Sequence, residues 1–180
     1  MLHGSLVARV GDGGLQGAEI DMGSEFGSTV LGTMNVLMAA CLASGQTVIA
    51  NAAREPEVVE LVNFLNCCGA KIRGGGSSEI IIDGVDSLFA CDYRIPADRI
   101  EAATYLAAVG VAGGEITVEG ARADHMDMLI RKLGEMGLRV SPTLDGLLAA
   151  APDRLRAIDV STLPYPGVAT DYKPMFVAML

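Results

Sequence analysis

Two stretches of this chain share one pattern of apolar residues, and this internal repeat restricts the possible folds more than any other feature. Helically spaced apolar residues that end at a glycine occur once and recur 68 residues later. The two sets are Val58, Leu61, Val62, Leu65, Gly69 and Met126, Leu129, Ile130, Leu133, Gly137. The preceding segments 43–49 and 112–118 repeat at an offset of 69. We therefore expect one structural unit of about 70 residues to be used twice.

Glycine and proline punctuation predicts the order βαβαββ within each unit. In the first copy we expect strands at 5–10 and 17–21, joined as a hairpin by the turn 11–14, and then a helix at 30–43. A strand at 47–49 follows, and the turn 51–56 leads into a second helix that ends at Gly69. The last two strands, at 70–72 and 79–83, are joined by the turn 74–76. Hydrophobic residues make up 51% of the chain, with 4% aromatic and no Trp. A core of small aliphatic side chains suits close packing of helices on sheets, so the expected class is α/β (α+β).

A third copy begins near the end of the chain. The residues Ala97, Asp98 and Arg99, which open a predicted helix of the second copy, match Thr170, Asp171 and Tyr172 at an offset of 73. The expected units are 1–90, 91–156 and 157–180. By the spacing of copy two, the glycine that closes this last helix would fall beyond Leu180. We therefore expect the chain to be a fragment of a larger repeating protein.

The segment that leads into this last helix holds the main candidate for chemistry. Pro164, Pro166 and Gly167 exclude regular structure, so the chain should arrive as a stiff loop. Thr170 and Asp171 are residue types that cap a helix start, and a first turn tolerates the following Pro174. The pattern predicts a carboxylate, Asp171, at a helix N-terminus, where the alternative is a plain cap with no further role.

Charge and composition exclude several classes of function. The net charge of −9 argues against a nucleic-acid or anionic-membrane surface, although a small anion could still bind at helix N-termini. No apolar run reaches about 18 residues, so we expect no membrane span and a cytoplasmic location. The four cysteines lack metal-ligand spacing and fit reduced thiols, with Cys67 and Cys68 in or near the core. His3 and His125 are isolated, so no metal site is expected.

Several motifs resemble one family in order and spacing over nearly the whole chain. The motifs are Asn51-Ala-Ala-Arg-Glu-Pro-Glu-Val-Val59, Asn63-Phe-Leu with Gly69-Ala-Lys-Ile72, Asp98-Arg99-Ile-Glu-Ala-Ala-Thr104 and Leu163-Pro-Tyr-Pro-Gly-Val-Ala-Thr-Asp171. They are similar to the UDP-N-acetylglucosamine 1-carboxyvinyltransferases, a branch of the enolpyruvyl transferase family. The resemblance implies a middle portion of such an enzyme. It also implies pseudo-threefold sets of βαβαββ units, arranged as an inside-out α/β barrel.

The resemblance implies transfer of enolpyruvyl from phosphoenolpyruvate to the 3′-hydroxyl of UDP-N-acetylglucosamine, for peptidoglycan precursor synthesis, without a cofactor. Asp171 matches the carboxylate that meets the attacking hydroxyl. Gly27, Ser28, Thr29 and Val30 match a nucleotide-binding loop, either within 27–33 or, in another register, within 23–29. The resemblance implies a lysine in this loop, but neither register of this chain contains one. An upstream Lys-Asn pair, a reactive loop and later arginines of the family have no match, so we expect no turnover from these 180 residues without the rest of the polypeptide.

Two alternatives remain at this point. One is the shikimate-pathway enolpyruvyl transferase of the same fold, and the other is a non-catalytic repeat module for binding or assembly. Arg54 and Glu55 could reach a cleft, but such a pair before a helix is usually a surface ion pair.

Overall fold

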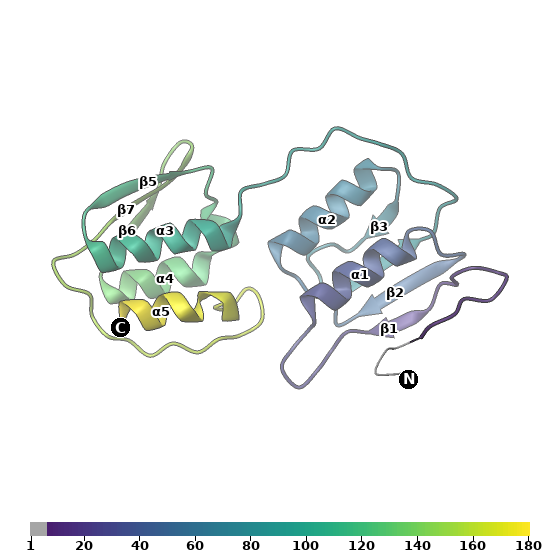
Figure 1. The fold of residues 1–180 in the computed structure, drawn as a ribbon, viewed down its shortest axis with the longest axis horizontal. Coiled ribbons are helices and arrows are strands. Elements are labelled where there is room, and N and C mark those ends of the chain that lie inside the picture. Colours follow the sequence, from purple (N-terminus) through teal and green to yellow (C-terminus); the bar gives the residue numbers. More distant parts are fainter. Residues whose placement is uncertain (1–6) are drawn as a thin grey trace. The chain divides into compact units, whose positions relative to one another are not determined.

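The computed structural model describes residues 7–180, which fold into two compact units of mixed α/β structure (Figure 1). The division falls between Tyr93 and Arg94. Each unit has its own sheet and its own hydrophobic core. Strand 5–10 of the predicted hairpin lies partly outside the described residues.

The first unit is a four-stranded sheet in the order β1-β2-β4-β3, with two helices on one face (Figure 1). Its elements are β1 (Glu19–Asp21), α1 (Val30–Ala40), β2 (Gln46–Ala50), α2 (Pro56–Cys67), β3 (Lys71–Arg73) and β4 (Glu79–Asp83). Strand β1 pairs in parallel with β2, whereas β2 with β4 and β3 with β4 are antiparallel.

The second unit is a three-stranded sheet in the order β5-β7-β6, with all pairs antiparallel. Its elements are α3 (Arg99–Ala112), β5 (Glu115–Glu119), the 3₁₀ turn η1 (Ala123–His125), α4 (Asp127–Met136), β6 (Arg139–Pro142), β7 (Gly146–Ala150), the 3₁₀ turn η2 (Thr170–Tyr172) and α5 (Lys173–Met179). Helix α5 packs beside α3 (Figure 1). Residues 157–180 therefore add to this unit, and their assignment to a third copy stays a prediction.

The internal repeat is visible in the pairing of the strands. Strands β5, β6 and β7 pair with one another as β2, β3 and β4 do. The counterpart of β1 is missing, because the described residues between β4 and α3 form no strand. The prediction of a complete βαβαββ order in copy two was therefore wrong in its first strand. In place of a sheet edge, this connecting segment runs along α2, where Phe89 N–H donates to Cys68 O at 2.9 Å.

The predicted apolar stripes form the two cores. Val58, Val62 and Leu65 of α2 are buried, and so are Leu129 and Leu133 of α4. Burial of each such side chain stabilises the fold by about 1.5–3 kcal/mol. Both helices end where expected, with Gly69 at φ 95° and Gly137 at φ 100°, a conformation that glycine adopts at little cost. The repeated stripe therefore predicted the helix–sheet packing of both units.

The predicted hairpin at the start of the chain was wrong. Residues 7–10 form no strand, although Gly14 N–H donates to Gly11 O at 3.1 Å in the expected turn. Strand β1 instead pairs with β2, with Glu19 opposite Val48. Parallel neighbours need a long crossover, which here is α1, so a local turn signal could not show this pairing.

Cys67 was wrongly predicted to lie in or near the core. Cys68 is buried, as expected, because it follows Leu65 by three residues and so shares its face of α2. Cys67 follows Leu65 by two residues and is exposed. Both thiols are free, as are Cys41 and Cys91.

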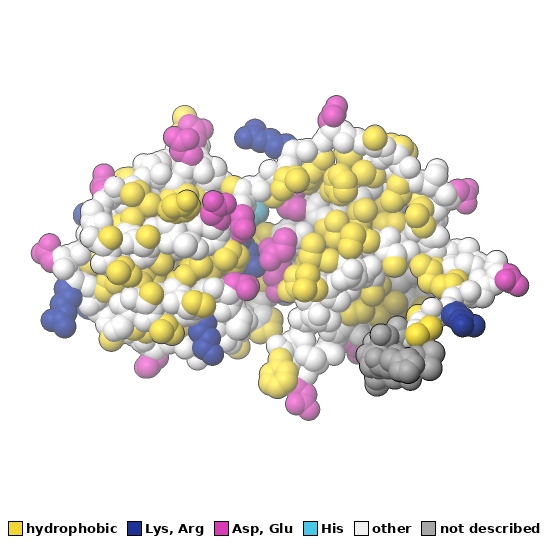
Figure 2. Space-filling model, in the orientation of Figure 1, with side chains coloured by type: hydrophobic (Ala, Val, Ile, Leu, Met, Phe, Trp, Pro, Cys, Tyr) yellow, Lys and Arg dark blue, Asp and Glu magenta, His cyan; other side chains and the backbone are white. Residues whose placement is uncertain are grey.

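The helical face of each unit carries exposed hydrophobic side chains (Figure 2). On α1, Leu31 is 73% exposed and Met38 is 46% exposed. On α3 and α5, Val111 is 61% and Val177 is 72% exposed. Contiguous apolar surface of this kind commonly marks a face that contacts another protein segment.

Candidate functional site

The predicted nucleotide loop forms a closed turn directly before α1. Gly27 has φ 103°, and its N–H and C=O exchange hydrogen bonds with Ser24 at 3.1 and 3.0 Å. Thr29 is the N-cap of α1, and its hydroxyl accepts a hydrogen bond from Gly32 N–H at 3.2 Å. Val30 is the first helical residue. The loop therefore presents backbone groups and the Ser28 side chain at a helix N-terminus, whereas the Thr29 hydroxyl is already used as a cap.

The side chains of Asp21 and Thr33 hold this loop in place. The Asp21 carboxylate accepts hydrogen bonds from Gly23 N–H at 2.7 Å and from Asn51 Nδ2 at 3.0 Å. The bond from Asn51, followed by that from Gly23, lowers the pKa of Asp21 below its ordinary value. Buried Thr33 donates to Thr29 O at 2.8 Å and accepts from Ala53 N–H at 3.1 Å. The 51–53 segment is thus tied to the loop. The sequence carries no local signal for this arrangement, because Asn51 and Asp21 are 30 residues apart.

Arg54 and Glu55 do not form the ion pair expected from their adjacency. Arg54 Nε instead donates to Gly76 O at 3.0 Å. Glu55 stands at the N-cap of α2 without a capping bond. Its Oε2 is buried and has no hydrogen-bond partner within the described part of the chain. Buried polar atoms are normally satisfied, so a ligand donor would complete this carboxylate.

Asp171 lies on the surface of the second unit but does not cap a helix. It is the middle residue of η2, and the N-cap positions of η2 and α5 are Ala169 and Tyr172, neither with a side-chain capping bond. Pro174 does lie in the first turn of α5, as predicted. The cap prediction was wrong because one 3₁₀ turn precedes the helix and moves Asp171 into that turn. Its side chain is exposed and available to a ligand.

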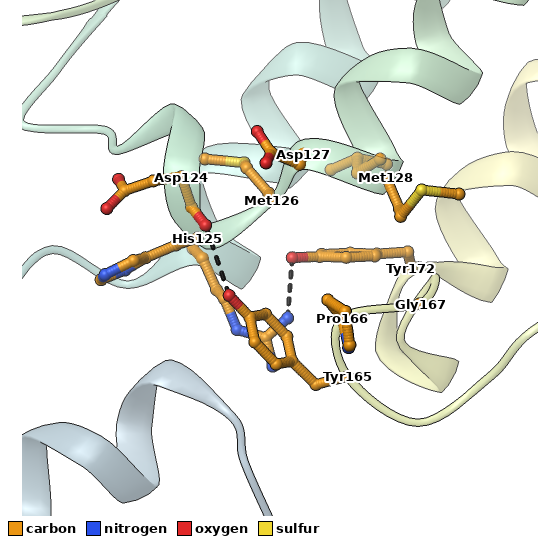
Figure 3. Close-up of a pocket in the computed structure, with 11 residues that line it drawn as sticks. Asp124, His125, Met126, Asp127, Met128, Tyr165, Pro166, Gly167 and Tyr172 are labelled. Carbon is orange, nitrogen blue, oxygen red and sulfur yellow. Dashed lines mark hydrogen bonds between the residues drawn. The ribbon is translucent and has the colours of Figure 1, made fainter. Parts of the chain in front are cut away.

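The turn that carries Asp171 is held through its neighbour Tyr172. This tyrosine is 1% exposed, and its hydroxyl accepts a hydrogen bond from Arg99 Nη1 at 2.9 Å (Figure 3). Arg99 is the first residue of α3 and only 7% exposed. Its guanidinium lies 5.6 Å from the ring centroid of Tyr172 and 6.0 Å from that of Tyr165. Arg99 therefore connects the start of α3 to both aromatic side chains around Asp171.

Asp98, the neighbour of Arg99, is the N-cap of α3, in agreement with the prediction that a helix opens here. Its Oδ1 accepts from Ile100 N–H at 2.7 Å. Sequence reasoning missed the role of Arg99. The available signal was a cation at the first position of a helix that is otherwise mostly apolar.

The proline-rich loop is closed by its own backbone. Leu163 N–H donates to Val168 O at 3.0 Å, and Gly167 N–H donates to Pro164 O at 2.8 Å. The Tyr165–Pro166 peptide is cis. Tyr165 Oη reaches Asp124 O at 3.3 Å, which attaches the loop to η1 (Figure 3). The loop is therefore fixed at both ends, in agreement with the stiffness that its prolines predict.

A small pocket lies between this loop and η1 (Figure 3). Its volume is about 30 Å³, room for about two water molecules. Asp124 lines the pocket, and the hydrogen bond from Arg122 lowers the pKa of Asp124 below its ordinary value. Asp171 does not belong to its lining. This pocket therefore lies beside the turn of Asp171, on the side of Tyr172, without including the Asp171 side chain.

Within residues 7–180, no three His, Cys, Asp or Glu side chains are grouped in a way that could hold a metal ion. No helix in the described part of the chain has the length and apolar character needed to cross a bilayer.

The predicted loop 27–30 belongs to the first unit and Asp171 to the second.

A comparison with protein families decides where this fold belongs. The family model described as EPSP synthase (3-phosphoshikimate 1-carboxyvinyltransferase) matches residues 3–180. The chain belongs to the enolpyruvyl transferase family. Among solved structures, the enolpyruvyl transferase NikO from Streptomyces tendae superposes with a TM-score of 0.80 at 24% identity, over 92% of this chain and 42% of that one. EPSP synthase from Acinetobacter baumannii gives 0.57 at 19% identity, over 92% and 37%. These similarities support the shared fold.

Two curated members of the enolpyruvyl transferase family are closer in sequence. UDP-N-acetylglucosamine 1-carboxyvinyltransferase 1 from Halalkalibacterium halodurans is 42% identical over 178 residues, which is 99% of this chain and 40% of the relative. The enzyme of the same name from Symbiobacterium thermophilum is 49% identical over 165 residues, which is 92% of this chain and 37% of the relative. The chain therefore spans about two fifths of the length of these relatives.

Proposed function

We propose that this chain is part of a UDP-N-acetylglucosamine 1-carboxyvinyltransferase, an enzyme of peptidoglycan precursor synthesis. The observation that carries this proposal is the identity of 42–49% to enzymes of that name over almost the whole chain. The substrates would be phosphoenolpyruvate and UDP-N-acetylglucosamine, and no cofactor is needed. We also propose a cytoplasmic location, without nucleic-acid or membrane partners.

The finer architecture belongs to the same proposal. The repeated pairing of β2-β4-β3 and β5-β7-β6 supports pseudo-threefold sets of βαβαββ units that close into an inside-out α/β barrel. Residues 157–180 would then start a third unit that continues in the rest of the polypeptide. The exposed hydrophobic residues of α1, α3 and α5 would be covered by those further units, since such surface is costly to leave in water.

In the proposed reaction, Asp171 takes the proton of the sugar 3′-hydroxyl. The hydroxyl oxygen then bonds to C2 of phosphoenolpyruvate while C3 gains a proton, which gives a tetrahedral intermediate. Loss of a C3 proton and of phosphate restores the double bond in the product. An exposed carboxylate on a fixed turn suits this role, because a general base must reach the hydroxyl within hydrogen-bond distance. The backbone N–H groups of Ser28 and Val30, with the Ser28 hydroxyl, would bind the nucleotide at the start of α1, because the N–H groups of Gly27 and Thr29 already donate to Ser24 O and Met22 O.

A second candidate has one observation in its favour. The family model that matches the chain is described by the shikimate-branch enzyme, 3-phosphoshikimate 1-carboxyvinyltransferase. The two branches share phosphoenolpyruvate and the release of phosphate, and they differ in the acceptor. The experiment must therefore determine which acceptor the enzyme uses.

The test is phosphate release from phosphoenolpyruvate by the full-length protein, with either UDP-N-acetylglucosamine or shikimate 3-phosphate as acceptor. The proposal predicts release with the sugar nucleotide and only background release with shikimate 3-phosphate. The reverse preference would assign the chain to the shikimate branch. Absence of release with both acceptors would favour a non-catalytic module.

A further inference from the structure

Three of the four cysteines meet where α2 ends. Cys67 is the last residue of α2, Cys68 is its C-cap, and Cys91 lies in the segment that connects β4 to α3. The Sγ atoms of Cys68 and Cys91 are 3.6 Å apart. Cys67 lies beside the same segment, with its Sγ 3.9 Å from O of Asp92, the residue that follows Cys91. The thiol of Cys91 thus contacts Cys68, and Cys67 lies close by at the same helix end.

The connecting segment is attached to α2 on both sides of Cys91. Before it, Phe89 N–H donates to Cys68 O at 2.9 Å. After it, the Tyr93 hydroxyl donates to the Glu60 carboxylate, and the Tyr93 ring packs edge-on against Phe64 with centroids 5.5 Å apart. These two attachments hold the Cys91 sulfur against the helix end. A disulfide needs the sulfurs at about 2.05 Å, so they must move closer by about 1.5 Å.

We propose that Cys91 and the Cys67–Cys68 pair form an oxidation site, at which a hydroperoxide converts two neighbouring thiols into a disulfide that includes Cys91. In the first step a thiolate sulfur attacks the peroxide oxygen and becomes a sulfenic acid, with release of water from hydrogen peroxide. In the second step a neighbouring thiol sulfur attacks the sulfenic sulfur. The S–S bond forms, the S–O bond breaks, and the hydroxyl leaves with the thiol proton as water. Two thiols and one hydrogen peroxide thus give one disulfide and two waters.

Exposure and position assign the roles within this site. Cys67 is exposed, so it is the thiol that a dissolved peroxide meets first. Hydrogen bonds with Cys67, burial and a contact with Cys68 raise the pKa of Cys91 to about 12, so Cys91 carries little thiolate and is a poor nucleophile towards a dissolved peroxide. Its position against the helix end, with its Sγ 3.6 Å from that of Cys68, makes it the thiol of the second step. A bond between Cys67 and Cys68 is disfavoured, because neighbouring Cα atoms are about 3.8 Å apart and disulfides usually need 4.4 Å or more.

The sequence allows a direct test by peptide mapping of the full-length protein. Cleavage by trypsin leaves Cys67 and Cys68 in the peptide 55–71 and Cys91 in the peptide 74–94. Cys41 is in a third peptide, 10–54. The reduced protein is treated with hydrogen peroxide, alkylated and digested without reductant. The expected product is 55–71 linked to 74–94, with one alkyl group on the remaining thiol of 55–71 and otherwise two hydrogens lighter than the sum of the two peptides. Dithiothreitol should separate the two peptides again.

Matched variants assign the sulfurs and control for non-specific oxidation. Cys91→Ser should abolish the link, and Cys67→Ser should slow its formation. Cys41→Ser should leave the link unchanged, because Cys41 is buried in the α1 end, where its Sγ lies 3.1 Å from Leu37 O. The proposal is overturned if 55–71 and 74–94 stay unlinked while both peptides are recovered alkylated. It is also overturned if the peptides are joined only between two protein molecules.

Discussion

Tyr172 and Arg99 make the contact by which Asp171 is positioned. The hydrogen bond between them is 2.9 Å long, and both side chains are buried. Bonds of this kind, to a charged donor shielded from water, contribute about 1.5–3 kcal/mol. The turn Thr170–Tyr172 is therefore fixed by tertiary contacts of Tyr172 rather than by a helix cap.

We expect Tyr172→Phe to lower the free energy of unfolding by about 1–3 kcal/mol, because the ring stays packed while the hydroxyl is lost. Chemical denaturation of the full-length protein measures this change. Tyr105→Phe is the matched control, since that ring is 53% exposed, and its loss of stability should be near zero. Equal values for the two variants would show that the buried hydrogen bond contributes nothing.

The Asp21 carboxyl predicts how the stability of the folded protein depends on pH. Its pKa is lowered, first by the hydrogen bond from Asn51 and then by that from Gly23. A group with a lowered pKa in the folded state contributes stability above its unfolded pKa of about 3.9, and this contribution is lost as the pH falls through the folded pKa. The bonds that hold the 27–30 loop should therefore be intact at neutral pH and weaken in acid.

Asn51→Ala should raise the pKa of Asp21 towards its ordinary value, because it removes the largest cause of the shift. NMR titration of the Asp21 carboxyl measures both pKa values. The stability difference between the two proteins should also shrink below about pH 4, where the carboxyl becomes protonated. An Asp21 pKa that is the same in both proteins would contradict this account of the loop.

At the scale of elements, Thr29 tests whether the start of α1 depends on its cap. Thr29→Ala should cost about 0.5–2 kcal/mol of stability, and Thr29→Ser should restore most of it because serine keeps the hydroxyl. Ser28→Ala is the control in the same loop. Thermal unfolding of the three variants measures the effect. A loss of stability in Ser28→Ala as large as in Thr29→Ala would place the cap elsewhere.

The elements that the sequence predicted correctly are those fixed by local patterns. The spacing of apolar residues predicted helices α2 and α4 together with their buried faces, because side-chain spacing along a helix decides which face is buried. The glycine after each stripe predicted where the helix ends. Helix α1 was also predicted, although it ends at Ala40 rather than at 43 because the chain turns there, with Ala43 N–H bonded to Ala40 O.

The features that the sequence did not predict depend on partners far along the chain. The parallel pairing of β1 with β2 and the missing first strand of copy two are choices between distant segments. At the candidate site, the motif indicates Asp171 and the loop 27–30, and their roles stay predictions. The cap prediction for Asp171 failed because burial of Tyr172 against Arg99, 73 residues earlier, decides the local turn. Local propensity cannot include such a contact.

At the scale of the whole molecule, the described structure holds parts of a site rather than a complete one. Loop 27–30 belongs to the first unit and Asp171 to the second, and Asp171 is not part of the lining of the pocket of about 30 Å³ beside its turn. The chain spans about 40% of the length of one close relative and 37% of another. Exposed apolar residues on α1, α3 and α5 remain available for further units.

We expect these 180 residues alone to show no turnover with phosphoenolpyruvate and UDP-N-acetylglucosamine, whereas the full-length protein turns over. The reason is that these residues span about two fifths of the length of the curated relatives, so most of the proposed enzyme is missing from them. A phosphate-release assay on the purified fragment, with circular dichroism to confirm that it is folded, measures this. Product formed by the fragment would contradict the expectation.

The central claim is that Asp171 acts on the acceptor hydroxyl in an enolpyruvyl transferase. Its most direct test is kcat/KM for phosphate release by the full-length protein and its Asp171→Ala variant, with UDP-N-acetylglucosamine as acceptor. Loss of a general base predicts a decrease of about 10²–10⁴-fold. Asp145→Ala, which changes another exposed carboxylate of the same unit, should retain full activity. An Asp171→Ala enzyme as active as this control would contradict the account.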